Sequence, residues 1–206
     1  MHIKDWAYNN DQTVNEKKTK LSVFRRPRGK VNADVSGCQI EHVENFKLLG
    51  VMFDDRLTFT LHITDVLSTC SQRLYLLKLL RDKGMPLPCL HVVYVSLVVN
   101  KITYCISAWG GFIRELYVNK IDSLFRKAKK YGFTTTLYDF RGLMLHHDEN
   151  LYHSIICDNH CLNHLLPSSR TNILSLRDRG HAFELPKCRT DLYKCSYVPR
   201  HLYNTM

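Results

Sequence analysis

Histidine and cysteine residues gather in one short stretch near the C-terminal end: His153, Cys157, His160, Cys161 and His164. Steps of four, three and four place all of them except Cys161 on one face, if the stretch is a helix, and both residue types bind zinc. Structural zinc sites usually join a closely spaced pair of ligands to a second pair, and this spacing matches no such arrangement. Cys157 can instead be a small buried apolar residue. We therefore expect no metal ion here.

A second candidate for metal chemistry is His146-x-Asp148 with a later histidine, His153 or His181, a combination that holds iron in 2-oxoglutarate dioxygenases. The block from Lys18 to Phe46 also resembles a short segment associated with AlkB-type nucleic-acid repair proteins. That triad normally sits on a double-stranded β-helix, whereas the sequence around Asp148 predicts a helix. We keep an AlkB-type oxygenase only as an unfavoured alternative. The chain has neither a G-x-S-x-G turn nor a phosphate-binding G-x-x-x-x-G-K-[ST] loop.

The positive charge is unevenly distributed. The net charge is +10, and cations are concentrated in three segments, 17–30, 112–132 and 167–206. The first holds seven cations and no acid, and the second holds six cations and two acids. Clusters of Lys and Arg indicate a polyanionic partner, because they displace the counterions condensed on phosphates. The alternative is an ordinary solvated basic surface.

The apolar pattern changes its period near residue 58. Residues 1–58 predict a short helix at 6–16 followed by strands around 21–23, 31–35, 39–43 and 46–53, because apolar residues alternate with polar ones between turn signals. From Thr58 the period is that of helices, with one face formed by Ile63, Leu67, Cys70, Leu74 and Leu77. Further helices are predicted at 88–109, 117–131 and 149–166, and the tail from Ser168 shows little periodicity.

Export is not indicated by the sequence. The longest apolar candidate, 92–99, is too short for a bilayer, and no apolar segment follows Lys4 and Asp5 as a signal peptide requires. The eight cysteines include no C-x-x-C pair, so we expect reduced thiols rather than a disulfide framework. We expect an intracellular protein without a membrane partner.

One ordered set of residues resembles the end of the palm domain of non-LTR (LINE, jockey-like) retrotransposon reverse transcriptases. The set is Trp6, Asn15, Lys18-Thr19-Lys20, Phe24 and Phe46-Lys47-Leu48-Leu49-Gly50-Val51. In that family a W…N…N-x-x-K-T-K-x-x-x-F segment leads into a two-stranded turn, F-K-Y-L-G-V, which grips the primer. Leu48 stands where the family usually has tyrosine.

The helical half extends this resemblance over nearly the whole chain. Leu57-Thr58-Phe59 and 72–77 look like the thumb that follows the primer grip. Tyr104-Cys105 with Ala108-Trp109-Gly110 matches the family's L-x-Y-C-x-x-x-W-G stretch, and 165–170, 176–181 and 183–186 resemble its C-terminal region.

The resemblance implies an α-dominant α+β fold, with a small antiparallel palm remnant followed by a helical thumb-like bundle. We expect a palm-end remnant at 1–57, a thumb-like region at 58–134 and a C-terminal extension with a basic tail at 135–206. Nuclear localisation would follow if the chain behaves as the parent element does.

The resemblance also implies descent from an RNA-directed DNA polymerase. The metal-binding aspartates of that family lie upstream of the matched block, where only Met1 to Asp5 stand, and Asp54-Asp55 falls after the block rather than in the catalytic turn. We expect a fragment without catalysis, cofactor or metal that binds template–primer duplexes weakly. Lys18 would be a vestigial general acid for pyrophosphate departure. The expected nucleic-acid contacts are Lys18, Lys20, Phe46, Lys47, Leu49, Gly50, Arg126, Lys127, Lys129 and Lys130. A non-enzymatic helical interaction module is the main alternative.

Overall fold

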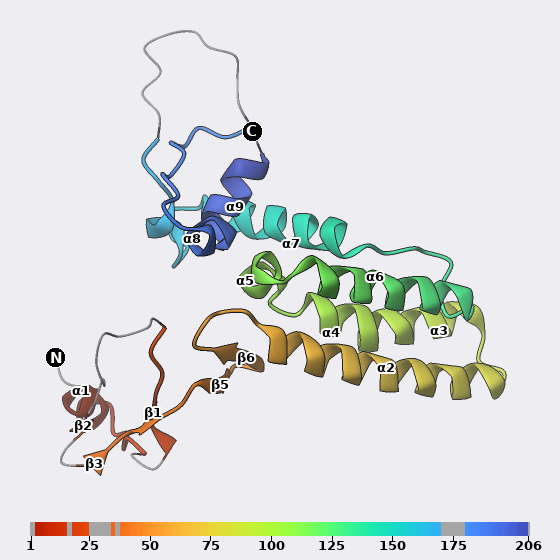
Figure 1. Ribbon diagram of the computed structural model, residues 1–206, viewed down its shortest axis with the longest axis horizontal. Helices are drawn as coiled ribbons and strands as arrows, with labels where there is room; N and C mark the ends of the chain where they lie inside the picture. The colour runs from red at the N-terminus through yellow and green to blue at the C-terminus, as the bar shows by residue number, and fades with distance from the viewer. Residues whose placement is uncertain (1–2, 16–17, 25–33, 36–37, 170–179, 206) are drawn as a thin grey trace, which may run out of the picture. The chain divides into compact units, whose positions relative to one another are not determined.

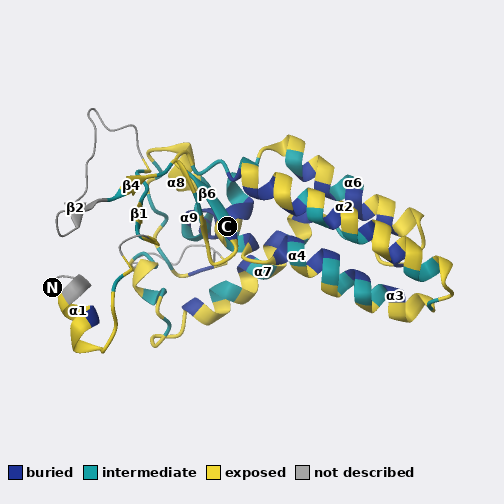
Figure 2. Cartoon of the chain, turned by 90° about the horizontal axis from the view of Figure 1, so that it is seen from below, coloured by how far each residue is buried: buried dark blue, intermediate teal, exposed yellow. Residues whose placement is uncertain are grey.

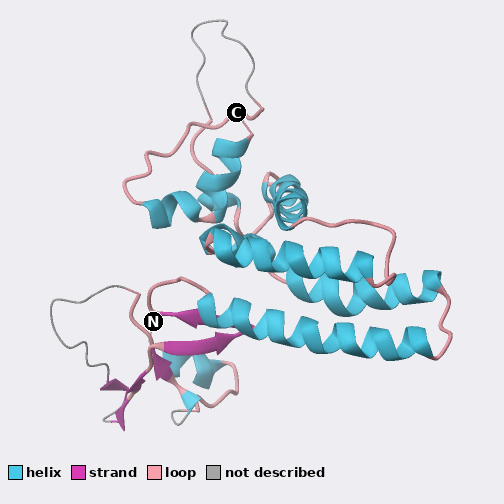
Figure 3. Cartoon of the chain, turned by 45° about the vertical axis from the view of Figure 1, so that its right-hand side comes forward, coloured by secondary structure: helices cyan, strands magenta, loops and turns pink. Residues whose placement is uncertain are grey.

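The computed structural model describes residues 3–15, 18–24, 34–35, 38–169 and 180–205. The chain divides into two compact units, Met1–Thr58 and Phe59–Met206, and each is described by itself. Helices dominate and the strands are short (Figure 3), so the predicted α-dominant α+β class is confirmed.

The first unit contains one short helix and three small pairs of strands. Helix α1 (Ile3–Asn9) ends earlier than predicted, and Asp11 has φ 52°, a conformation that cannot continue a helix. The paired strands are β1 (Lys20–Leu21) with β4 (Glu41–His42) in parallel, β2 (Asp34–Val35) with β3 (Cys38–Gln39) in antiparallel, and β5 (Asn45–Leu48) with β6 (Val51–Asp54) in antiparallel. The hairpin expected at 46–53 is therefore confirmed. Val23 lies outside a strand, and 31–33 lie outside the described residues.

The second unit is an up-down-up-down arrangement of four helical rods (Figure 1). The rods are α2 (Thr60–Asp82); α3 (Leu87–Tyr94) with η2 (Val95–Val99), α4 (Asn100–Thr103) and α5 (Ile106–Trp109); α6 (Glu115–Lys130); and α7 (Phe140–Ile155). The second rod is divided into shorter helical pieces: α3, η2 and α4 follow one another, and α5 turns away from them.

The core lies between these rods (Figure 2). On α2 the predicted face is confirmed except at Leu67, which is partly exposed, and Gly84 ends the rod with φ 86°. On α6 the buried face is Val118, Ile121, Leu124, Phe125 and Ala128. Tyr131, the last residue of the helix predicted at 117–131, is 48% exposed. Each fully buried large apolar side chain contributes about 1.5–3 kcal/mol to folding, so these faces provide the main stabilisation of the unit.

The second rod bends where α4 meets α5. Cys105 has φ 53°, and the fully buried Trp109 donates its indole N–H to the carbonyl of Tyr104 at 2.9 Å. The bend interrupts the helix backbone, and the indole satisfies a carbonyl that the interrupted helix would leave unpaired. The Y-C-x-x-x-W stretch of the sequence is therefore a packing feature of this corner.

The apolar segment Leu87–Phe112 is long and apolar enough to cross a membrane, by length and composition only. The expectation that no apolar segment is long enough for a bilayer is therefore wrong by this measure, because it did not allow for single polar residues such as Lys101. Core helices of soluble proteins pass the same test, and this segment places Leu90, Tyr94 and Ile102 in the core of the second unit.

The fourth rod is displaced from its predicted range. A helix was expected at 149–166, whereas α7 spans Phe140–Ile155. Its start is fixed by Asp139, whose carboxylate accepts a hydrogen bond from the Gly142 N–H at 2.7 Å. Its end is fixed by Asn163, whose side-chain amide donates to the carbonyls of Ile155 and Ile156. Asn163 then lies in η4, a 3₁₀ turn at Asn163–Leu165.

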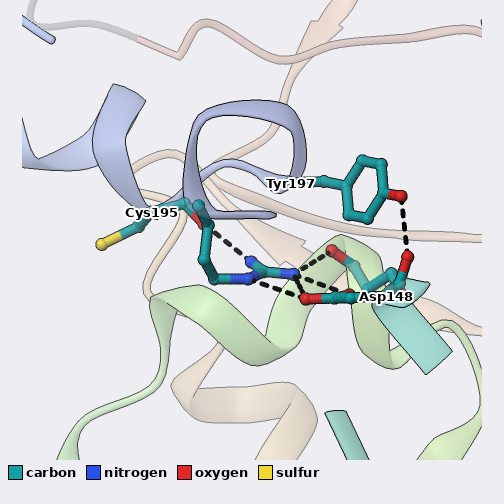
Figure 4. Close-up of polar contacts among 5 residues, drawn as sticks. Asp148, Cys195 and Tyr197 are labelled. Atoms are coloured by element: carbon teal, nitrogen blue, oxygen red, sulfur yellow. Dashed lines mark hydrogen bonds and ion pairs between the residues drawn. The ribbon is translucent and has the colours of Figure 1, made fainter. Parts of the chain in front are cut away.

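Two short helices near the C-terminus were not predicted, α8 (Asp191–Cys195) and α9 (Tyr197–Asn204). A buried ion pair joins α9 to α7 (Figure 4): Arg200 Nη2 lies 2.8 Å from Asp148 Oδ2, with 9% and 1% of the two side chains exposed. Arg200 also donates to the carbonyls of Cys195 and Ser107. The guanidinium therefore holds α9 against both α5 and α7.

Breaking this pair from either side should be costly. We expect Asp148→Ala or Arg200→Ala to lower the free energy of unfolding by about 3–5 kcal/mol, because each leaves an unpaired buried charge. The apolar double variant Asp148→Leu/Arg200→Met should lose much less than the sum of the two single losses. Urea unfolding followed by circular dichroism measures both quantities.

The matched control is the exposed pair Arg141–Glu115, whose side chains are 60% and 61% exposed. Arg141→Ala should cost less than about 1 kcal/mol. A loss at Asp148 no larger than the loss at Arg141 would contradict the assigned role of the buried pair.

Candidate nucleic-acid interface

The β5–β6 hairpin presents a two-residue turn. Leu48 pairs with Val51, and the turn residues Leu49 and Gly50 have φ 45° and φ 87°. Positive φ at both positions is the type I′ geometry that suits the twist of a hairpin. The Leu49 side chain is 82% exposed at the tip. The positive φ at Gly50 shows that this bend favours a glycine.

An aromatic cluster supports one face of this hairpin. The rings of Phe46 and Phe53, which are cross-strand partners, stack with centroids 5.4 Å apart. Phe24 meets Phe46 edge-on at 5.9 Å. Phe46 is therefore committed to packing, whereas the next residue, Lys47, points to the other side of the strand and is exposed. Of the two, Lys47 is the better placed to meet a ligand.

The lysines that precede the hairpin are on the surface. Lys20 Nζ lies 3.5 Å from a carboxylate oxygen of Glu41 on the paired strand, so its charge is partly compensated. Lys18 is exposed, and its backbone N–H donates to the carbonyl of Asn15. The role of Lys18 as a vestigial general acid stays a prediction.

Asp54 organises the turn that follows the hairpin. Its carboxylate accepts hydrogen bonds from the N–H groups of Arg56 and Thr58 at 3.0 and 2.9 Å, and from the Thr58 hydroxyl at 3.0 Å. Each carboxylate oxygen is thus occupied by turn donors. Asp54 therefore has a structural role, which is to stabilise the turn at residues 56–58.

The C-terminal half of α6 carries four exposed cations, Arg126, Lys127, Lys129 and Lys130. The acids of the same helix are used elsewhere: Glu115 pairs with Arg141, and Asp122 accepts the N–H of Phe140 at 2.8 Å. Among the described side chains, none forms an ion pair with these four cations. All four side chains therefore face outward. The helix macrodipole favours cations at this end, which by itself accounts for part of the pattern.

A groove between α2 and α6 was not anticipated. Its volume is about 660 Å³, and its lining adds cations and aromatic residues to the α6 set. The residues that sequence reasoning missed are Tyr75, Lys78, Arg81, Lys120 and Tyr131. The available signal was helical spacing: Ser71, Tyr75 and Lys78 form one stripe of α2, and Lys120, Ser123 and Lys127 form one of α6.

The histidine and cysteine cluster does not lie on one helix face. Because α7 ends at Ile155, the residues Cys157 and His160 lie in the turns that follow it, and the helical arrangement predicted for them is wrong. His160 Nδ1 accepts the N–H of Leu162. In the described part of the chain, no group of three or more His, Cys, Asp or Glu side chains is placed to hold a metal ion.

His146 and Asp148, the candidate iron ligands, have different partners and different exposure. His146 is exposed and its Nε2 lies 3.1 Å from the Asn150 side-chain amide, whereas the Asp148 carboxylate is buried against Arg200. Both residues lie on α7 rather than on strands. The Asp148 carboxylate is therefore occupied by Arg200, and it is not placed to bind iron together with His146.

A comparison with known proteins connects this chain to the polymerases of mobile elements. A region of 121 residues, 58% of the chain, is 33% identical to the "Probable RNA-directed DNA polymerase from transposon BS" of Drosophila melanogaster. The chain spans only 13% of the length of that relative. No family model matches the chain, and no solved structure matches it. The chain thus contains a region related to the reverse transcriptase of a retrotransposon.

The hairpin turn offers a test of the geometry on which this site depends. Gly50→Ala should weaken the hairpin by roughly 1–2 kcal/mol, because a side chain is unfavourable at this positive φ. Leu49→Asn should be neutral or stabilising, since asparagine tolerates this conformation. Hydrogen exchange of the amides that pair β5 with β6 measures the local opening free energy. Faster exchange in Leu49→Asn than in Gly50→Ala would contradict the turn geometry.

Proposed function

We propose that this chain is a non-LTR reverse-transcriptase fragment that binds nucleic acid without polymerising it. In this proposal the second unit is a thumb-like module, and the cations of α6 contact the phosphates of a template–primer duplex without reading sequence. The observation that carries the proposal is the exposed set Arg126, Lys127, Lys129 and Lys130, which has no acidic partner among the described residues. The similarity to a transposon polymerase supports it.

The hairpin of the first unit would serve as a primer-grip-like element. Lys47 and Leu49 are both exposed near the tip of the hairpin, and Gly50 allows the tight turn that forms this tip. An ammonium and a backbone turn can steady a phosphodiester backbone, and the aromatic cluster under the hairpin keeps the turn rigid. Lys18 and Lys20 are proposed as further backbone contacts, with Lys20 weaker because Glu41 partly neutralises it.

Polymerisation by this chain alone is not expected. Two-metal phosphoryl transfer needs carboxylates that face a shared pair of cations. Asp54 instead directs its carboxylate to the N–H groups of the following turn. The polymerase activity in the name of the Drosophila relative therefore enters the proposal only as ancestry.

A non-enzymatic interaction module is the second candidate, and one observation favours it. A mainly apolar hollow of about 420 Å³ lies among α5, α7, η4, α8 and α9, lined by residues such as Leu151, Leu165 and Val198. Binding of nucleic acid that is weak and insensitive to salt would favour this candidate over the first.

Charge reversal on α6 tests the binding surface. We expect micromolar or weaker affinity for a duplex, falling steeply with salt. The triple variant Arg126→Glu/Lys129→Glu/Lys130→Glu should flatten the slope of log affinity against log salt by roughly 0.9 for each phosphate that is no longer neutralised. Fluorescence anisotropy with labelled DNA–RNA duplexes, titrated at several salt concentrations, measures this slope.

The control has the same loss of charge on another surface. Lys187, Arg189 and Lys194 are exposed on the segment that leads into α8 and on α8 itself. The triple glutamate variant of these residues should retain most of the slope. Equal slopes for the two triple variants would show that net charge rather than the α6 surface governs binding.

A primer-extension assay tests the absence of synthesis. With an RNA template, a DNA primer, nucleotides and Mg²⁺ or Mn²⁺, we expect no incorporation above background, because two-metal chemistry needs a pair of carboxylates and Asp54 is engaged by its own turn. Incorporation that requires a template and is abolished by Asp55→Ala would overturn the inactive-fragment proposal.

A further inference from the structure

The groove between α2 and α6 has the properties of a ligand site. The two helices run in the same direction (Figure 1) and lie side by side (Figure 2). Small side chains, Ser71 and Ser123, stand on the facing stripes, so the helices leave a hollow of about 660 Å³ between them. Its apolar floor includes Leu74 and Leu124, which are 8% and 5% exposed.

Only basic and neutral side chains line this groove. The cations are Lys78, Arg81, Lys120 and Lys127, and none of the lining residues is acidic. Arg81 is engaged by Asp82 and by the carbonyl of Tyr131 at 2.6 Å, and the ammonium of Lys120 lies over the ring of Tyr117. Lys78 and Lys127 have no polar partner among the described residues. The groove therefore keeps uncompensated positive charge at its rim.

Two tyrosines complete the lining. Tyr75 on α2 and Tyr131 at the end of α6 are 62% and 48% exposed, although aromatic rings are costly to leave in water. Arg81 fixes the backbone at Tyr131 by its hydrogen bond, and Phe133 packs edge-on against the Tyr131 ring with centroids 5.9 Å apart. This tyrosine is therefore held in place before any ligand arrives.

An unpaired nucleotide strand fits this combination better than a duplex does. A duplex keeps its base faces stacked inside and offers phosphates to a protein, whereas an unpaired strand offers flat apolar bases as well. Single-strand sites combine cations that follow the backbone with aromatic rings that stack on bases. A hollow of this size accepts a small number of nucleotides and cannot admit a whole duplex.

We propose that the α2–α6 groove binds a single-stranded segment of DNA or RNA. Lys78 and Lys127 contact its phosphates, a base lies over the floor formed by Leu74 and Leu124, and Tyr75 and Tyr131 each stack on a base. The proposal rests on the nucleic-acid binding proposed above. It adds a site that shares only Lys127 with the exposed cations of α6, and a ligand class that those cations do not define.

A charge-neutral block of the groove provides the test. Ser123→Phe fills the hollow without altering any charge, and Tyr75→Ala removes one stacking surface. Each should weaken the binding of a labelled dT₁₂ oligonucleotide by about tenfold, within the range for removal of one base–aromatic stack. Binding of a blunt duplex of the same length should change less than about twofold, because phosphate contacts dominate there. Fluorescence anisotropy on the full chain reads both probes.

Matched controls separate the groove from general damage. Asn119→Phe adds a similar ring to an exposed position of α6 outside the groove, and Tyr8→Ala removes a tyrosine that is 83% exposed on α1. Neither should change dT₁₂ binding. Circular dichroism melting of all four variants shows whether each is folded. If Ser123→Phe does not fold, Lys78→Glu replaces it as the second groove variant.

The outcomes distinguish the two proposals. Unchanged dT₁₂ affinity in folded Ser123→Phe and Tyr75→Ala would overturn the groove proposal, even if duplex binding responds to charge reversal on α6. Weaker dT₁₂ binding in these variants supports the groove, even if duplex binding proves insensitive to α6. Failure of the wild-type chain to bind either probe at low salt would overturn both proposals.

Discussion

The buried ion pair of Asp148 and Arg200 is the constraint on which the arrangement of the second unit depends. A charge removed from water is tolerated only when its partner and its remaining hydrogen bonds are all present. Here the guanidinium reaches one carboxylate and two carbonyls, which belong to α7, to the end of α8 and to α5. Gly111 has no room for a side chain, because a Cβ there would collide with Arg200 and with the carbonyl of Cys195. The C-terminal helices are thus joined to the bundle by an interaction that tolerates few changes.

Two titratable side chains near this ion pair, Tyr197 and His201, are held in their neutral forms by burial. The Tyr197 hydroxyl donates to the carbonyl of Asp148 at 2.9 Å, and burial raises the pKa of Tyr197, so its phenol remains protonated. Burial lowers the pKa of His201, whose ring lies 4.4 Å from that of Tyr152. A neutral imidazole adds no competing cation beside Arg200. The polar cluster is therefore consistent with a fixed structural joint rather than with a site that exchanges protons.

The distribution of charge on α6 follows from the same requirement that acids find partners. Glu115 pairs with Arg141, and Asp122 accepts the N–H of Phe140, so both acidic residues of α6 are paired with the start of α7. The cations at the other end stabilise the helix terminus and remain exposed. The acids of α6 thus lie against the start of α7, and the other end of the helix presents a basic surface. Helix stability alone therefore does not distinguish a binding surface from a solvated one.

Much of the fold could be predicted because local signals agreed with the packing. On α2, apolar residues recur at helical spacing and Gly84 ends the rod, and at the hairpin Gly50 marks the turn. The prediction failed at α7, where the helix start depends on the single cap Asp139 and the end on Asn163, eight residues beyond the carbonyl of Ile155 that it caps. The groove could not be predicted, because it exists only when the serines of two separate helices face each other. Of the expected nucleic-acid contacts, only their exposure and local partners are established, and their roles stay predictions.

The residues of the family resemblance and the expected nucleic-acid contacts fall into two physical groups: those packed in the fold and those exposed on the surface. Tyr104-Cys105 and Trp109 form the corner of the second rod, so the fold alone accounts for their pattern. Lys47, Leu49 and the cations of α6 are exposed and belong to no packed core. A chain that kept the scaffold alone would need the first group and could lose the second without unfolding. Nucleic-acid binding as proposed therefore depends on the exposed residues and the groove, where a change of charge or shape alters the ligand contact while the core remains intact.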